Sequence, residues 1–173
     1  AHDPFCDIKE LCEFNFSFVE RLSNRPLIIN IKSERIEPYV QALLSKANYL
    51  GEHFYLDSSF SVINNNGASI SISARFSDFE PLEICQRLAE SNLINWVWID
   101  TFRNLPLSVS SVEYFTGSGI NTCLTSPDLL GRPEDIFPYF KKMNELNFIP
   151  TAICCKQETI KTWEELYFKK FNF

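Results

Sequence analysis

Six short apolar runs, each followed by polar residues, constrain this chain more than any other feature of its sequence. They lie at residues 27–34, 53–59, 69–77, 96–102, 121–128 and 151–156. Stretches that suit helices separate most of these runs, and this alternation is typical of parallel strands joined by crossover helices. In a barrel of such units, the polar residues that follow the strands meet at one open end, where the chemistry takes place.

A closed barrel of this kind has eight strands, whereas the sequence offers six candidates. The chain has 173 residues, fewer than the roughly 250 of a typical barrel and the minimum of about 200. Its only methionine, Met143, is internal, so we expect further residues upstream of Ala1. No linker-like segment divides the sequence. We therefore predict a single, incomplete α/β domain of the TIM-barrel type over residues 1–173.

Most of the connecting segments have the apolar spacing and the start and stop signals of helices. The expected helices lie at about 7–22, 36–48, 81–91, 110–118 and 132–146, and a last helix begins near Glu158. Residues 60–67 are short for a crossover helix, and Asn64-Asn65-Asn66-Gly67 predicts a turn there. Pro127 is expected to end the strand before Asp128.

Composition excludes several classes of function. The net charge of −6 argues against a nucleic-acid binder, which needs a basic stripe for phosphate contacts. No run of 18 apolar residues is present, so we expect no membrane span. The six cysteines lack CxxC spacing and there are only two histidines, which argues against a zinc site. A chain that can build a core of this size needs no disulfides, so we predict reduced cysteines and a cytoplasmic protein.

Side chains alternate along a strand, so the polar residues at the strand ends fix which face points inward. The residues expected to share the inward face toward the open end are Asn30 with Lys32, Tyr55 with Asp57, Ser73 with Arg75, Trp96 and Trp98 with Asp100 and Phe102, Leu124 with Ser126 and Asp128, and Cys154 with Lys156. They predict a mixed-charge pocket floored by aromatic rings. Such a pocket suits an anionic ligand that carries hydroxyls, for instance a phosphorylated sugar or polyol.

An alternative assigns the same charged residues a structural role. In it, Lys32 with Asp57 and Arg75 with Asp100 are ion pairs between neighbouring strands that satisfy each other. The two histidines also differ in what they predict. His2, in the His2-Asp3 dipeptide, could reach the open end because it precedes the strand of Lys32. His53 lies at the amino end of its strand and is interpreted as structural.

The order of these motifs resembles a known superfamily. The matching pieces are His2-Asp3 and the segments PLIINIKSE, FYLDSS, ISARFSDFEP, WVWIDTF, CLTSPDLLGRPEDI and AICCK. Together they are similar to the barrels of glycerophosphodiester phosphodiesterases and phosphatidylinositol-specific phospholipase C. The resemblance is closer to a poorly characterised bacterial branch linked to polysaccharide or capsule loci. It implies a (β/α)8 barrel of which this chain supplies strands 3–8 and lacks the first two.

The resemblance also implies a chemistry in which two histidines act as general acid and base on a phosphodiester beside a divalent cation, Mg²⁺ or Ca²⁺. His2 matches the second histidine, and Lys32 matches the lysine that contacts the phosphate. Asn30 stands where the family has a carboxylate ligand, which makes it a weak metal ligand. The first histidine and the main metal ligands are expected upstream, so this chain alone should be catalytically incomplete.

Three hypotheses follow. The first is a metal-dependent phosphodiesterase whose substrate, a phosphorylated sugar or polyol or a glycerophosphodiester, is held by residues at the strand ends. The substrate-binding residues in that hypothesis are Asp57, Arg75, Trp98, Asp100, Ser126, Asp128 and Lys156. The second is a non-catalytic barrel that binds a phosphorylated sugar or lipid headgroup. The third is a structural half-barrel completed by another chain, which predicts an obligate oligomer, for instance a homo-oligomer.

Overall fold

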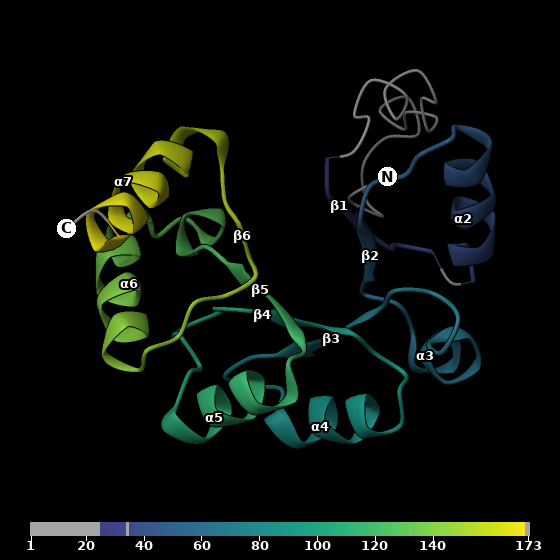
Figure 1. The fold of residues 1–173 in the computed structure, drawn as a ribbon, viewed down its shortest axis with the longest axis horizontal. Helices are drawn as coiled ribbons and strands as arrows, with labels where there is room; N and C mark the ends of the chain where they lie inside the picture. Colours follow the sequence, from purple (N-terminus) through teal and green to yellow (C-terminus); the bar gives the residue numbers. More distant parts are fainter. Residues whose placement is uncertain (1–24, 34, 172–173) are drawn as a thin grey trace. The chain divides into compact units, whose positions relative to one another are not determined.

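Short strands alternate with helices along the chain, as the sequence predicts (Figure 1). The computed structural model describes residues 25–33 and 35–171. Each of the six apolar runs contains one strand: β1 (Leu27–Asn30), β2 (His53–Leu56), β3 (Ser73–Phe76), β4 (Trp96–Ile99), β5 (Asn121–Thr125) and β6 (Ala152–Cys154). The helix expected over residues 7–22 lies outside the described residues.

The strands form two sheets in which strand order follows chain order. One sheet joins β1 to β2, and the other has the order β3-β4-β5-β6. Pairing is parallel between β1 and β2, between β4 and β5, and between β5 and β6. The parallel α/β architecture is therefore confirmed, whereas the closed eight-stranded barrel stays a prediction.

Contacts divide the chain into two compact units, Ala1–Ser73 and Ala74–Phe173. We call them the first and second units, and each is described by itself. A single domain over the whole chain stays a prediction. In the first unit, α2 (Glu37–Lys46) joins β1 to β2, and β2 is followed by α3 (Phe60–Asn66). Among the described residues, no helix is long and apolar enough to cross a membrane.

The helix α3 corrects the turn that we expected over Asn64–Gly67. Asparagine is a poor helix former, but Val62 and Ile63 are buried on one side of this segment. Burial of such apolar side chains stabilises short helices more than intrinsic propensity does. The backbone amide of Gly67 still bonds to the carbonyl of Ile63, so the helix ends where the turn was predicted.

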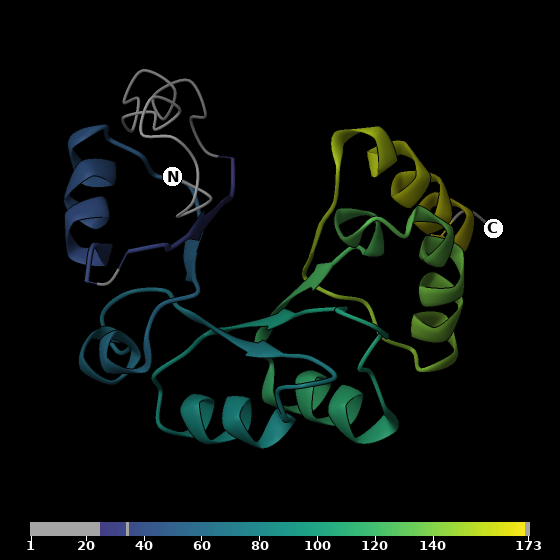
Figure 2. The ribbon, with the colours of Figure 1, turned by 180° about the vertical axis from the view of Figure 1, so that it is seen from behind.

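In the second unit, helices cover the sheet formed by β3 to β6. These helices are α4 (Leu82–Glu90), α5 (Val109–Ser118), α6 (Ile136–Glu145) and α7 (Ile160–Phe171). In both ribbon views α4 and α5 lie side by side, and so do α6 and α7 (Figure 2). Ser108 caps α5 through a reciprocal capping box with Ser111, and Gly119 ends it in the left-handed conformation at φ 67°.

The core of the second unit lies between this sheet and its helices. Val97, Ile99, Cys123, Leu124 and Met143 have no exposed surface. Because β4 is largely buried on both faces, its sequence, WVWI, is a continuous apolar run rather than an alternating one. The strands end at the predicted polar positions: Asp100 follows β4, and Pro127 opens a 3₁₀ turn (Pro127–Leu130) just after β5.

Candidate functional site at the carboxyl ends of the strands

The carboxyl ends of β1 and β2 in the first unit hold an ion pair between Lys32 and Asp57. Lys32 Nζ lies 2.9 Å from Asp57 Oδ2, as the structural alternative predicted. The two side chains are 36% and 24% exposed, so water screens the pair. Asp57 adopts a positive φ of 64°, which aspartate tolerates better than most residues. Asn30, the predicted weak metal ligand, is the exposed last residue of β1.

His53 lies at the opposite, amino end of β2, as predicted. Its Nε2 is 3.0 Å from Oε1 of Gln41, and that oxygen also accepts a hydrogen bond of 3.1 Å from the hydroxyl of Tyr55. The imidazole ring packs edge-on against Tyr49 and Tyr55. Burial, together with the nearby Glu37 carboxyl, raises the pKa of Tyr55 to about 12. These contacts agree with a structural role for His53.

The carboxyl ends of β3 and β4 in the second unit hold a different kind of ion pair. Arg75 Nη1 is 3.6 Å from Asp100 Oδ2, again as the structural alternative predicted. Asp100 is only 6% exposed and accepts two further hydrogen bonds. Trp98 Nε1 donates to Oδ2 at 3.2 Å, and the backbone amide of Thr101 donates to Oδ1 at 2.9 Å. The buried carboxylate therefore has a fixed orientation, and it faces Arg75.

Two phenylalanines and a second arginine surround this pair, and sequence parity did not identify them as a group. The Arg75 guanidinium lies over the ring of Phe102 at 5.5 Å from its centroid. The rings of Phe102 and Phe79 are 6.1 Å apart, and the Arg103 guanidinium lies over Phe79 at 5.1 Å. We call Arg75, Phe102, Phe79 and Arg103 the arginine–phenylalanine ladder. It joins the loop after β3 to the loop after β4.

Ser77 fixes the first of these two loops. Its hydroxyl accepts hydrogen bonds from the backbone amides of Phe79 at 3.1 Å and Glu80 at 3.0 Å, and it donates to Glu80 Oε2 at 2.7 Å. Such a serine turn is a common start to a helix, here α4. Glu80 also lies 3.8 Å from Arg75 Nε. The local sequence SDFE could have signalled this turn.

Two other predicted site residues, Ser126 and Asp128, lie buried just after β5. Ser126 has no exposed surface and Asp128 is 1% exposed. The Asp128 carboxylate accepts hydrogen bonds from the Ser126 hydroxyl, from the backbone amide of Lys156 at 2.8 Å and from the Thr159 hydroxyl at 2.9 Å. Trp163 Nε1 donates to the Ser126 hydroxyl at 2.8 Å.

This buried network has a clear electrostatic consequence. Burial acts to raise the pKa of Asp128, but the hydrogen bonds from Ser126, Lys156 and Thr159 together outweigh it, so the pKa lies below its ordinary value. Protein donors thus surround the ionised carboxylate and tie β5 to the segment that opens α7. The Lys156 side chain, the last predicted binding residue, is exposed at the carboxyl end of β6.

The described cysteines, Cys85, Cys123, Cys154 and Cys155, are free thiols. Burial raises the pKa of each, to about 12 for Cys85, which disfavours the nucleophilic thiolate. Within the described residues, no group of three His, Cys, Asp or Glu side chains could hold a metal ion. The divalent cation stays a prediction. His2 lies outside the described residues.

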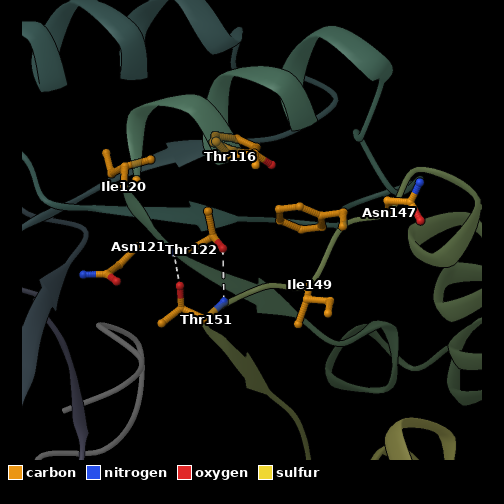
Figure 3. Close-up of a pocket in the computed structure, with 10 residues that line it drawn as sticks. Thr116, Ile120, Asn121, Thr122, Asn147, Ile149 and Thr151 are labelled. Atoms are coloured by element: carbon orange, nitrogen blue, oxygen red, sulfur yellow. Dashed lines mark hydrogen bonds between the residues drawn. The ribbon is translucent and has the colours of Figure 1, made fainter. Parts of the chain in front are cut away.

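A cavity of about 350 Å³ lies at the opposite, amino end of β5 and β6 (Figure 3). Its polar groups satisfy each other: Thr122 N bonds to Thr151 Oγ1 at 3.0 Å, and Thr151 N bonds to Thr122 Oγ1 at 3.2 Å. Ile120 and Ile149 add apolar surface, and no residue that lines the cavity is charged. An anionic ligand would find no counter-charge there, so we place the candidate site at the carboxyl ends.

The structure thus brings the predicted residues together in three groups. These are Lys32 with Asp57 in the first unit, and Arg75 with Trp98 and Asp100, and Ser126 with Asp128 and the backbone of Lys156, in the second. Comparison with family models, curated proteins and solved structures finds no match to this chain.

Proposed function

We propose that the protein binds a phosphorylated sugar or polyol at the carboxyl ends of β3 and β4. We also propose that it acts as a phosphodiesterase on diesters of such phosphates, for instance a glycerophosphodiester. The observation that carries the binding proposal is the anchored Arg75 guanidinium. Asp100 holds it in place from a buried position, and Arg103 lies at the other end of the same ladder. Guanidinium groups bind phosphate oxygens through paired N–H donors, so an anchored arginine suits a phosphate.

The charges in this group also set the expected strength of binding. Asp100 and Glu80 oppose Arg75 and Arg103, so the local net charge is close to zero. Long-range attraction therefore contributes little, and affinity must come from hydrogen bonds made at short range. We expect dissociation constants of about 0.1 to 1 mM, equivalent to roughly 4 to 5.5 kcal/mol. The partly exposed Glu80 carboxylate supplies acceptors for the ligand's hydroxyls.

The binding proposal can be tested with phosphate ligands and one substitution. Titration of the protein with glycerol 3-phosphate should give saturable binding by calorimetry. Arg75→Gln should weaken it about tenfold, because the charged donors are lost. Arg87→Gln, on the exposed side of α4, is the matched control and should bind as the unmodified protein does. Equal affinities for both variants would contradict the proposal.

Hydrolysis is the second part of the proposal, and it rests on the resemblance to the phosphodiesterases. In that mechanism His2 transfers a proton, while Lys32 and a divalent cation stabilise charge on the phosphoryl oxygens. The test is turnover of a chromogenic phosphodiester by the full-length protein with Mg²⁺ or Ca²⁺, compared with His2→Gln. We expect the substitution to abolish turnover.

The non-catalytic alternative predicts a different outcome in the same assay. Asn30 replaces a carboxylate at the predicted metal site, which favours a decayed site. Full-length protein that binds glycerol 3-phosphate, but neither binds the cations in calorimetry nor hydrolyses the diester, would be a binding protein only. An upstream sequence without a histidine and a Glu-x-Asp pair would contradict the hydrolytic part as well.

A further inference from the structure

The arginine–phenylalanine ladder presents unusual apolar surface to solvent. Phe79 is 60% exposed and Phe102 is 38% exposed, although both lie beside a charged cluster. Phenyl rings are usually buried, and a rigid exposed pair is more informative than scattered apolar residues. Each ring has one arginine near it, from β3 in one case and from the loop after β4 in the other. The exposed surface thus combines ring area with positive charge.

Arg103 supplies a guanidinium that forms no direct ion pair with a carboxylate of the described residues. Its contact is the ring of Phe79. The residue is exposed. A guanidinium over an aromatic ring retains its N–H donors at the edge, where they can bind an anion. Arg103 is therefore a second anion-binding group beside the anchored Arg75.

Arg132, from the 3₁₀ region before α6, holds the loop that carries Phe102 and Arg103. Its guanidinium donates to the backbone carbonyl of Arg103 at 2.6 Å, to that of Phe102 at 3.4 Å, and to that of Thr101. It also pairs with Asp135 at 3.0 Å. With Ser77 fixing the other loop, the backbone that carries both rings is held before any ligand arrives. A preorganised backbone costs less entropy on binding.

We propose that the ladder binds the sugar ring of an anionic saccharide, with the apolar face of the ring against Phe79 and Phe102 and the anionic group on the arginines. The inference rests on the proposed binding function and specifies its ligand: a ring-shaped sugar phosphate rather than an open-chain polyol phosphate. The C–H face of a pyranose buries apolar area against a phenyl ring, while its hydroxyls stay at the rim. Glu80, with a side chain that is 39% exposed, lies beside the ladder as an acceptor for those hydroxyls.

The experiment compares a phosphate that carries a sugar ring with a phosphate that carries none. Glucose 1-phosphate should bind about tenfold more tightly than glycerol 3-phosphate, a difference of about 1.4 kcal/mol in binding free energy. Phe79→Leu keeps the apolar character but removes the aromatic ring, so it should weaken glucose 1-phosphate more than glycerol 3-phosphate and abolish the difference between them. Arg103→Gln should weaken both ligands. Phe137→Leu, at a 63% exposed position on α6, is the matched control.

The outcomes separate this inference from the function on which it rests. Equal binding of the two phosphates, with Arg75-dependent affinity for both, would overturn the sugar-ring inference and leave the proposed function intact. Failure of both phosphates to bind would overturn both. Tighter binding of uridine 5′-monophosphate than of glucose 1-phosphate would overturn the saccharide assignment, because a base would then be the preferred ring. Loss of the preference for glucose 1-phosphate over glycerol 3-phosphate in Phe137→Leu would also overturn the inference.

Discussion

The carboxyl ends of the strands carry the same charge pattern in the two units, yet the two ion pairs are built differently. Lys32 and Asp57 are 25 residues apart, and the same spacing separates Arg75 from Asp100. In the first unit, both side chains are partly exposed to water. In the second, the aspartate is buried, accepts hydrogen bonds from an indole and a backbone amide, and faces an arginine that lies over a ring.

The difference shows what makes a polar strand end a plausible binding site. An exposed ion pair contributes little, because water screens the charges and the side chains lose entropy when they pair. A buried carboxylate with fixed donors holds its partner in one orientation, and a ligand can use that partner without ordering it first. The nitrogen–oxygen distance alone would mislead. It is 2.9 Å between Lys32 and Asp57 and 3.6 Å between Arg75 and Asp100, yet the first pair is the weaker candidate for a binding site.

The largest expected effect belongs to Asp128, the buried carboxylate after β5. Its substitution tests whether buried hydrogen bonds stabilise the second unit at this strand end as they do at Asp100. Asp128→Ala would leave the Ser126 hydroxyl, the Lys156 amide and the Thr159 hydroxyl without their acceptor. We expect the free energy of unfolding to fall by about 3 kcal/mol, since such groups each cost roughly 1–3 kcal/mol when left unpaired. Urea unfolding followed by tryptophan fluorescence measures it, because Trp163 bonds to Ser126.

A matched control separates this loss of stability from the general effect of removing a carboxylate. Glu145→Ala removes a carboxylate from the exposed pair with Lys141, where the side chains are 69% and 63% exposed. Its effect should stay below about 0.5 kcal/mol. A fall in Asp128→Ala no larger than that would mean that the buried network does not stabilise the second unit.

The next prediction compares the two aspartates directly. Asp100→Asn keeps the shape but removes the charge that faces Arg75 and receives the Trp98 and Thr101 donors. It should cost about 2 kcal/mol. Asp57→Asn, which retains the tolerance for a positive φ, should cost less than about 0.5 kcal/mol. Far-UV circular dichroism during urea unfolding reports on both variants. Equal losses of unfolding free energy in Asp100→Asn and Asp57→Asn would contradict the proposed difference between the two ion pairs.

The dependence of stability on pH gives a smaller and more specific test. Asp128 has a folded-state pKa below its unfolded value, so its contribution is complete above about pH 4 and is lost as the pH falls through the folded-state pKa. Asp128→Asn should therefore make the decline of stability in acid shallower, by at most about 1.4 kcal/mol per pH unit. Unfolding midpoints measured from pH 5 downward check this, and an unchanged slope would contradict the lowered pKa.

Much of the fold follows from periodicity in the sequence. Each apolar run contains a strand, and the helices expected at about 36–48, 81–91 and 110–118 correspond to α2, α4 and α5. The alternation of side chains also placed the charged residues that form ion pairs on the same face, because side chains two residues apart on a strand share a face. The exception, α3, arose because Asn64–Gly67 has turn chemistry locally while the burial of Val62 and Ile63 favours a helix.

The candidate site was only partly predictable, because its character depends on contacts between loops. Nothing local in the sequence places Phe79 beside Phe102, or aims Arg132 at the carbonyls of residues 101–103. Parity predicted that Asp128 shares the inward face, but it could not show that protein donors would surround the carboxylate. Loop packing, rather than strand pattern, therefore separates binding residues from structural ones.

The smallest expected effect belongs to the exposed pair of the first unit. Lys32→Met removes the charge that faces Asp57 and should lower stability by at most about 1 kcal/mol at low salt. In 1 M NaCl the effect should disappear, because the screening length falls to about 3 Å. Circular dichroism is the suitable probe, since all three tryptophans lie in the second unit. A loss above about 2 kcal/mol that survives in salt would be typical of a desolvated pair. The carboxyl ends of β1 and β2 would then have an equal claim to the phosphate, with Lys32 as the residue that binds it.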